Sequence, residues 1–266
     1  RLVGSEMCIR DRNEADMKIL FIQHSCFVVE IENKVLIFDW FDKARITGYA
    51  FQGILPEFSK EKEIYLFASH KHQDHFDLNA LKWVEKYPKI QYILSKDIRL
   101  GDNYLARNGI PKEVKDRVTF VRPQTKYEVG DMEIKTLRST DAGVAFLVKT
   151  DGVNLYHAGD LNDWSMEGAG DLINGKMKRD YRRAIAELDG IHIDAAFVVL
   201  DPRLETHSMD GFDYFMQHVD ADLVFPMHMW RDYSLIGAYK KKSKNLRFTE
   251  RIVDITGENQ EFDCIC

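Results

Sequence analysis

Four side chains that can bind a metal ion lie within six positions of the sequence, in the pattern H-x-H-x-D-H. They are His70, His72, Asp74 and His75. Histidine nitrogen and carboxylate oxygen are ligands that suit zinc, manganese or iron. On one loop, His70 and His72 can face one metal while Asp74 and His75 face a second. Ordinary packing makes no use of three imidazoles and a carboxylate in so short a stretch, so the pattern predicts a metal site.

Strands must position this loop and bring more distant ligands to it. The apolar run 64–68 directly before the loop predicts a buried strand. Three further polar residues each follow an apolar, strand-like run: Asp39, Asp160 and His228. They are far apart in the sequence, so only folding can bring them to the loop.

The chain resembles the metallo-β-lactamase superfamily, whose hallmark is the H-x-H-x-D-H pattern. Its members also carry an aspartate after an early strand, a bridging aspartate in a Gly-Asp context and a late histidine after another strand. Here Asp39, Asp160 and His228 stand in those places and in that order. The resemblance implies an α/β fold of the αββα type, with two mixed β-sheets flanked by helices and two divalent metals at one edge between the sheets.

The superfamily's single histidine before the bridging aspartate is absent. Thr140 stands about where it belongs, and Asp141 is next to it. Asp141 either replaces the imidazole with a carboxylate, which favours manganese or iron over zinc, or is a residue of a tight turn. His207 lies ahead of a predicted helix and is expected in the second shell. It either compensates for the missing histidine or belongs to a polar turn.

Roles for the other residues follow from their chemistry. Asp160 is the best candidate to bridge two metals, because a carboxylate has two oxygens and imidazole has one free lone pair. Asp74 is expected to bind the second metal and to relay a proton. Asp39 and His157 are expected in the second shell; Asp39 would fix the tautomer of a ligand histidine, or else simply end its strand.

Two residues are candidates for substrate contact. In the branch of the superfamily that includes ascorbate-6-phosphate lactonase, a Gly-His-Ser segment lies near the metals, and this chain has Gln23-His24-Ser25. His24 is therefore predicted either to touch the substrate or to be a hydrogen-bonded structural residue. Arg231 is predicted to bind an anionic part of the substrate.

Composition narrows the class of protein. At 266 residues and 45% hydrophobic content, the chain can bury one large core. Its net charge of −6 argues against nucleic-acid binding. The four cysteines show no metal or disulfide spacing, which is typical of a reducing, cytoplasmic compartment. No apolar run approaches the ~18 residues of a membrane span. The sequence carries no signal for an oligomeric state.

Residues 1–16 lack periodicity and signal-peptide features, and we interpret them as a non-native or disordered extension. Residues 17–266 are predicted to form a single hydrolase domain. The expected strands are 19–22, 27–31, 35–38, 64–68, 90–94, 118–121, 127–129, 132–137, 144–150, 153–156, 194–200 and 221–225. The expected helices are 78–87, 98–108, 178–188, 212–219 and one from about residue 233.

The sequence therefore predicts a metal-dependent hydrolase that uses metal-activated water on a small ester, lactone or phosphorylated metabolite. Its expected cofactors are two divalent ions, zinc or manganese, with iron as a further option. Its expected partner is a small-molecule substrate, with no nucleic acid and no membrane. Two alternatives are a nuclease of the transfer-RNA 3′-processing type and a metal-binding module without catalysis.

Overall fold

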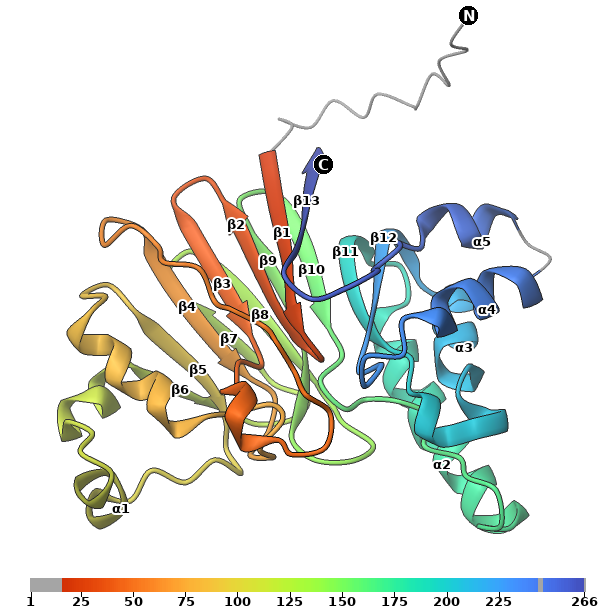
Figure 1. Cartoon of the computed structure of the whole chain (residues 1–266), viewed down its shortest axis with the longest axis horizontal. Helices are drawn as coiled ribbons and strands as arrows, with labels where there is room; N and C mark the ends of the chain where they lie inside the picture. The colour runs from red at the N-terminus through yellow and green to blue at the C-terminus, as the bar shows by residue number, and fades with distance from the viewer. Residues whose placement is uncertain (1–15, 244–245, 266) are drawn as a thin grey trace, which may run out of the picture.

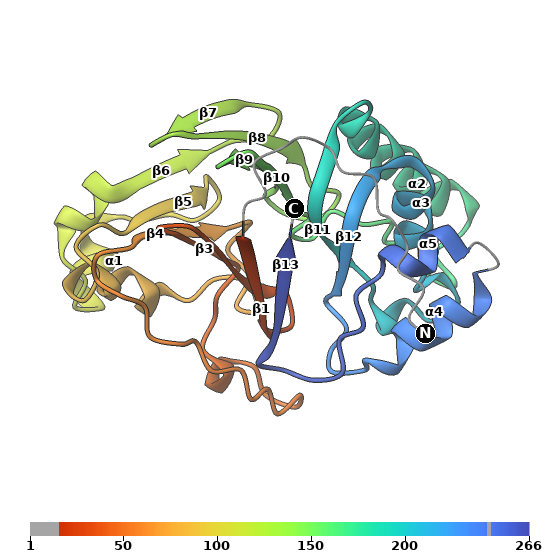
Figure 2. The ribbon, with the colours of Figure 1, turned by 90° about the horizontal axis from the view of Figure 1, so that it is seen from above.

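The structure is a computed structural model and describes residues 16–243 and 246–265. The predicted extension, residues 1–16, lies outside the described residues except for Asp16, where the first strand begins. Two β-sheets face each other, and helices cover their outer faces (Figures 1 and 2). Among the described residues, no helix is long and apolar enough to cross a membrane.

The first sheet has seven strands in the order β13-β1-β2-β3-β4-β5-β6. Strands β3 to β6 are parallel, whereas the pairs β13–β1, β1–β2 and β2–β3 are antiparallel. Strand β1 therefore runs in the same direction as β3, and the carboxyl ends of β1, β3 and β4 meet at one edge. The bounds are β1 (Asp16–Gln23), β2 (Cys26–Ile31), β3 (Lys34–Phe38), β4 (Glu63–Ala68), β5 (Gln91–Ser95), β6 (Val118–Val121) and β13 (Gln260–Ile265).

The second sheet has six strands in the order β12-β11-β10-β9-β8-β7. Strands β7 to β10 form an antiparallel meander, whereas β10, β11 and β12 are parallel. The carboxyl ends of these three lie at the edge that β1, β3 and β4 reach in the first sheet (Figure 1). The bounds are β7 (Lys126–Val129), β8 (Met132–Arg138), β9 (Val144–Thr150), β10 (Val153–His157), β11 (His192–Val199) and β12 (Asp220–Met227).

Helices α2 to α5 lie on the outer side of β11 and β12, whereas α1 lies on the side of the first sheet (Figure 2). The α-helices are α1 (Asp102–Arg107), α2 (Asp171–Ile185), α3 (Asp210–His218), α4 (Ser234–Lys242) and α5 (Leu246–Arg251). The 3₁₀ helices are η1 (Lys43–Arg45), η2 (Leu78–Glu85), η3 (Lys112–Arg117), η4 (Ala186–Leu188) and η5 (Pro202–His207).

The main core lies between the sheets, where aromatic rings from both interdigitate. Phe38 and Phe67 stack with ring centroids 4.7 Å apart, and Phe27 meets Phe197 at 4.4 Å. A second core lies between the first sheet and the elements η2, α1 and η3. Burial of both sheet faces explains the continuous apolar runs of β3 and β4.

The predicted αββα architecture is confirmed, and each predicted strand is present to within a few residues. The predicted helix 78–87 is instead the 3₁₀ helix η2, which begins after the capping residue Asp77. Helix α2 begins at Asp171, ahead of the predicted residue 178. The sequence pattern predicts the later start because Gly175 interrupts it, whereas the helix continues through this glycine. Strand β13 was not predicted; it is a short edge strand with alternating polar residues.

Candidate dinuclear metal centre

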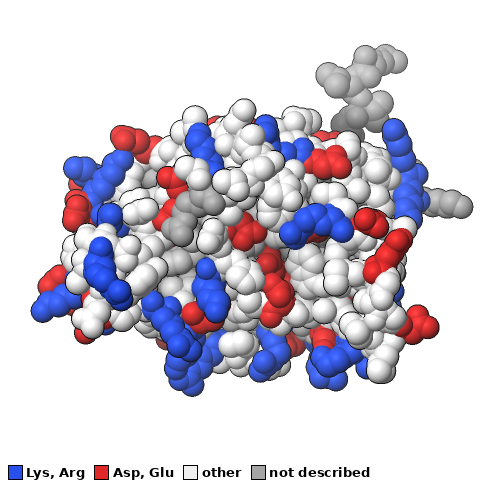
Figure 3. Space-filling view, turned by 60° about the horizontal axis from the view of Figure 1, so that its bottom comes forward, with Lys and Arg blue, Asp and Glu red and all other residues white. Residues whose placement is uncertain are grey.

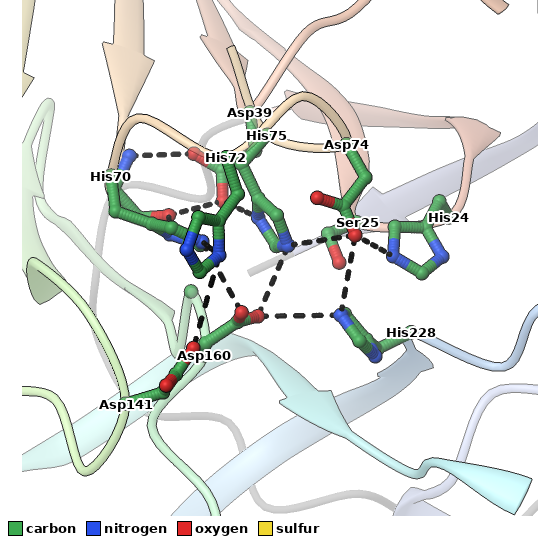
Figure 4. Close-up of polar contacts among 12 residues, drawn as sticks. His24, Ser25, Asp39, His70, His72, Asp74, His75, Asp141, Asp160 and His228 are labelled. Atoms are coloured by element: carbon green, nitrogen blue, oxygen red, sulfur yellow. Dashed lines mark hydrogen bonds and ion pairs between the residues drawn. The ribbon is translucent and has the colours of Figure 1, made fainter. Parts of the chain in front are cut away.

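The predicted ligands come together at the edge where the strands of both sheets end. The metal-ligand loop, residues 69–77, follows β4, and Asp160 and His228 follow β10 and β12. Figure 4 shows their side chains converging, together with His24 from the turn after β1. Parallel strands from two facing sheets place these loops at one edge, which explains how residues so distant in sequence meet.

The first group of donors consists of His70, His72, Asp141 and Asp160. His70 Nε2 lies 3.2 Å from Asp160 Oδ2 and 2.9 Å from His72 Nδ1. Asp141 Oδ2 lies 3.8 Å from His72 Nδ1, and both of these side chains are about half exposed. The carboxylate predicted to replace the missing histidine is therefore close enough to share a metal with His70 and His72.

The approach of the Asp141 loop depends on Gly143, whose φ is +66°. A Cβ at this position would lie 1.9 Å from the carbonyl oxygen of Ser69. Only glycine lets the loop pack directly against the start of the metal-ligand loop. The turn containing Asp141 is thereby held against His70 and His72.

The second group consists of His24, Asp74, His75 and His228. Asp74 Oδ2 lies 3.4 Å from His24 Nε2, 3.8 Å from His75 Nε2 and 4.0 Å from His228 Nε2. His24 is thus placed among the potential ligands, a role that the sequence did not predict for it. The sequence signal was present, since His24 lies two residues beyond the end of a predicted strand, as His70 does.

Asp160 connects the two groups through its two carboxylate oxygens. Oδ2 faces His70, whereas Oδ1 lies 3.1 Å from His75 Nε2 and 3.3 Å from His228 Nε2 (Figure 4). The preceding Gly159 has a φ of +51° and packs so closely on Ser69 that a Cβ would clash with it. Asp160 therefore lies between the two groups, with one oxygen towards each.

Asp39 orients two of the potential ligand histidines. Its Oδ2 accepts hydrogen bonds from His75 Nδ1 at 2.8 Å and from Ser69 Oγ at 2.7 Å. Ser69 Oγ in turn lies 2.9 Å from His70 Nδ1 and can accept its proton. Both imidazoles then direct Nε2 to the centre, which is the tautomer needed for metal binding.

Asp201, which follows β11, does the same for His228 and was missed by the sequence analysis. Its Oδ2 accepts from His228 Nδ1 at 2.8 Å, and its side chain is fully buried. Arg203 also donates to this carboxylate and stacks on the ring of Trp230 at 4.3 Å. The apolar run ending in Leu200-Asp201 repeats the Phe38-Asp39 pattern, and this repetition is the signal that could have found it.

Three residues of the centre have left-handed backbone conformations that are uncommon outside glycine. The φ values are 51° for His24, 48° for Asp39 and 63° for His228. Such conformations cost about 1 kcal/mol or more each and persist where the surrounding structure enforces them. Their concentration here is typical of a functional site.

The protonation states of most donors favour a cation. Burial alone raises the pKa of Asp160, but His75 and His228 outweigh it and hold that pKa well below its ordinary value. For Asp74, burial is likewise outweighed by the contact with His24 and by His75, so its pKa is lowered. Burial, with a contribution from His228, lowers the pKa of His24 to about 3. Both carboxylates are ionised and His24 is neutral, as ligands must be.

His75 differs from His24. Burial disfavours its charged form, but Asp160 and Asp39 outweigh this and raise its pKa well above the ordinary value. A metal ion bound at Nε2 must therefore displace a proton from His75, which makes metal binding weaker at low pH.

Several buried donor atoms have no hydrogen-bond partner within the described part of the chain. They are His24 Nε2, His75 Nε2, His228 Nε2 and Asp160 Oδ1. Leaving such an atom unpartnered costs about 1–3 kcal/mol. Donor atoms 3.1–4.0 Å apart suit an ion that binds each of them at about 2.0–2.2 Å. The residues therefore fit a divalent metal ion.

Other predicted residues lie outside the two groups. His157 donates from Nε2 to the carbonyl of Ser25 and accepts at Nδ1 from the Gly159 amide, and Nδ1 is 3.8 Å from Asp39 Oδ2. It supports the loops around the centre rather than a ligand directly. His207 Nδ1 pairs with Asp210 at 2.9 Å at the start of α3 and belongs to neither donor group. Compensation by His207 for the missing ligand is therefore not what the structure shows.

Arg231 makes several contacts within the protein. Its guanidinium donates to the carbonyls of Tyr49 and Ala50 and lies 3.4 Å from Glu258. These contacts tie the segment around residue 50 to the C-terminal part of the chain. The guanidinium is thus engaged within the protein, and anion binding by Arg231 stays a prediction.

The tied segment places aromatic rings beside His24. The ring centroids of Phe51 and Trp230 lie 5.5 Å and 4.4 Å from that of His24, and Tyr49 contacts Trp230 at 4.1 Å. These rings form an aromatic wall next to the second donor group. Nothing in the sequence pattern places residues 49–51 near His24, because they lie in a long connection without strand or helix periodicity.

Comparison with known proteins identifies the family. Residues 18–169 match the family described as "Beta-lactamase superfamily domain", and the chain belongs to this family. The predicted superfamily is thereby confirmed. The match includes the metal-ligand loop and Asp160, whereas Asp201 and His228 lie beyond it.

Two individual proteins are also similar to this chain. Two proteins named "UPF0173 metal-dependent hydrolase", from Pyrococcus furiosus and Pyrococcus abyssi, are 29% and 30% identical over 151 residues, which is 54% of this chain. The match spans 61% of the length of each of these relatives, less than two thirds.

Solved structures share the fold. Igni18, described as a novel metallo hydrolase from Ignicoccus hospitalis, has a TM-score of 0.60 at 16% identity, covering 93% of this chain and 98% of that one. CmlA, a diiron β-hydroxylase from Streptomyces venezuelae, has a TM-score of 0.54 at 12% identity, covering 97% of this chain and 55% of that one. One fold thus accompanies differently described activities, so function must be argued from the site.

Proposed function

We propose that this protein is a hydrolase that depends on two divalent metal ions held by the two donor groups. The observation that carries the proposal is the position of Asp160, whose oxygens face one group each while Oδ1 is buried and forms no hydrogen bond among the described residues. If Asp160 only stabilised the fold, groups of the protein would form hydrogen bonds with all these atoms. If it bridges two metal ions, these atoms would bind the metal ions instead.

A divalent ion bound here would polarise the substrate and lower the pKa of a water molecule from ~16 towards ~7, which makes hydroxide available at neutral pH. Asp39 and Asp201 hold the ligand imidazoles in the tautomers that expose Nε2. Asp74, whose side chain is 17% exposed, is the residue to which we assign relay of a proton. The aromatic wall keeps bulk water away from His24.

The substrate we propose is a small ester, lactone or phosphorylated metabolite, as in the ascorbate-6-phosphate lactonase-like branch. The support is the His24-Ser25 segment, because His24 belongs to the second donor group. For the metal we propose zinc or manganese, with iron as a further option. Asp141 in place of an imidazole makes the first group richer in oxygen, which favours the harder ions.

The nuclease alternative is less well supported by the charge on the face that carries the site. Figure 3 shows acidic side chains near the middle of this face and basic ones mainly towards its periphery. A nucleic-acid backbone requires continuous positive charge along its path. The acidic net charge of −6 also argues against a nuclease.

The test is metal content by plasma mass spectrometry on the full chain and on Asp141→Ala, with Asp116→Ala as the control for loss of an exposed aspartate. We expect about two equivalents of metal in the parent and control and about one in Asp141→Ala. One equivalent in all three proteins would contradict the two-metal mechanism. Loaded parent protein is then assayed on ester, lactone and phosphate monoester substrates, and no turnover of any would favour the non-catalytic module.

A further inference from the structure

A cavity of about 690 Å³ lies beside the metal-ligand loop, at the carboxyl ends of the neighbouring parallel strands β4 and β5. Lys71 is one of the residues that line it. His70 and His72, on either side of Lys71, belong to the first donor group. The loop therefore has the metal centre on one side and the cavity on the other. A volume of this size is in the range of small-molecule sites.

The charge of the cavity is opposite to that of the protein as a whole. Three exposed cations line it, Lys71, Lys96 and Arg99, against a single carboxylate, Asp97. Within residues 16–243 and 246–265, no ion pair involves any of the three cations. Lysines nearby behave differently: Lys86 pairs with Glu57 at 2.7 Å, and Lys115 pairs with Asp102.

Asp97 connects the cavity to the metal-ligand loop. Its Oδ2 accepts a hydrogen bond from the Lys71 amide at 3.1 Å. Its Oδ1 is buried and has no hydrogen-bond partner in the described part of the chain. A ligand hydroxyl or amine in the cavity could supply the missing donor.

The rest of the lining is largely apolar. Phe76, 8% exposed, follows the metal-ligand loop, and Tyr104, 45% exposed, comes from α1. An apolar floor with a few cations suits a ligand that has both an apolar body and an anionic group.

We propose that this cavity binds the non-reacting part of the substrate, and that this part is a small organic anion, a phosphate or carboxylate attached to an apolar body. The inference rests on the proposed hydrolase function, since it places the reacting bond of the same molecule at the metal centre. Lys96 and Arg99 hold the anionic group, and Phe76 and Tyr104 contact the apolar body. Binding energy from this remote part would orient the scissile bond.

The test uses naphthalene-2-sulfonate, an aromatic anion that no hydrolase of esters or phosphates cleaves, and naphthalene-2-methanol, its uncharged counterpart. Both are titrated by fluorescence into the metal-loaded full chain. The variant is Lys96→Ala/Arg99→Ala, and the matched control is Lys112→Ala/Lys126→Ala, which removes two exposed cations that do not line the cavity. Metal content is measured for every protein.

We expect the parent to bind the sulfonate more tightly than the alcohol, and the cavity variant to lose about fivefold to tenfold of the sulfonate affinity while the control keeps it. Equal binding of sulfonate and alcohol by the parent, or equal sulfonate binding by both double variants, would overturn the proposal. Arg99→Lys should retain most of the affinity. Because binding is read without turnover, a loaded protein that binds the sulfonate but hydrolyses nothing would refute only the hydrolase function.

Discussion

The two edges of the sandwich differ in whether their buried charged side chains are fully hydrogen-bonded within the protein. At the edge away from the metal centre, Lys34 begins β3 with its side chain 8% exposed, and Nζ lies 2.7 Å from Asp131 and 2.8 Å from Asp151. At the metal-centre edge, His75, His228 and Asp160 are equally buried, yet each keeps one atom without a hydrogen-bond partner among the described residues.

The difference separates stabilising charge from functional charge. Lys34 joins the first sheet to two turns of the second, and its partners satisfy it completely, so it needs no ligand. The metal-centre edge holds ionised carboxylates and imidazole nitrogens that include atoms without a hydrogen bond in the described part of the chain. Sites of this kind are retained where a ligand supplies the missing partner.

The largest expected effect is that of Asp160→Asn. An amide keeps one ligand oxygen but removes the charge and the second ligand atom, so the two groups can no longer share it. We expect at most about one equivalent of metal and a rate lower by about a thousandfold or more, since metal polarisation contributes several kcal/mol to catalysis. Metal content and turnover of the best substrate from the screen give the measurement.

The matched control is Asp151→Asn, the same chemical change at the opposite edge. It should lower the melting temperature and leave metal content and rate unchanged. If Asp151→Asn lost metal, or Asp160→Asn kept two equivalents, the separation between the two edges would be wrong.

The sequence predicted those features of the metal centre that are encoded in short, continuous segments. The metal-ligand loop is continuous, and the apolar runs before Asp39, Asp160 and His228 are unambiguous strands, so their common edge followed from the family resemblance. Residues whose partners are set by tertiary contacts were harder. Asp201 reaches His228 because β11 and β12 are parallel neighbours with Val199 opposite Met227, a register that no single sequence reveals.

The contact of His24 with Asp74 is a second feature that the sequence could not predict. Its position after a strand was clear, but its contact with Asp74 depends on the antiparallel path from β1 through β2 to β3, which brings the end of β1 back to the metal-ligand loop. The aromatic wall depends on hydrogen bonds such as that from the Gln52 amide to Glu258 at 2.6 Å, made across almost the whole chain. Pairings over such separations leave no periodic signal.

Asp201→Asn should have the next largest effect. The amide can still accept from His228 Nδ1, but it loses the charge that makes Nε2 a better ligand, and it leaves Arg203 without its carboxylate. We expect metal affinity at the second group to fall by about 10- to 100-fold, the usual range for such partners. Competition with a chromogenic chelator measures it.

Asp220→Asn is the control for Asp201→Asn, because Asp220 contacts His192 Nδ1 at 2.9 Å at the other end of the same pair of strands. It should leave metal affinity unchanged. Equal affinities for both variants would show that the contact between Asp201 and His228 is merely structural.

The smallest expected effect is on stability alone. Lys34→Met leaves Asp151, which is 15% exposed, without its cation, whereas Asp131, 64% exposed, remains hydrated. We therefore expect a loss of about 2 kcal/mol in the free energy of unfolding, less than for a fully buried pair, and a melting temperature lower by about 4–8 °C. Lys18→Met, which breaks an exposed pair with Glu261, should change the free energy by less than about 0.5 kcal/mol.

The pH dependence identifies the source of that loss. Burial alone lowers the pKa of Lys34, but the hydrogen bonds that its ammonium donates to Asp131 and Asp151 outweigh it and raise this pKa above its ordinary value of 10.5. A raised pKa in the folded state means that the stabilisation is fully present below pH 10.5 and is lost as the pH rises through the folded-state value. The gap in stability between the parent and Lys34→Met should therefore be constant near neutral pH and narrow above pH 10.5. A gap that persisted unchanged at high pH would show that packing of the lysine stem, and not its charge, closes this edge of the sandwich.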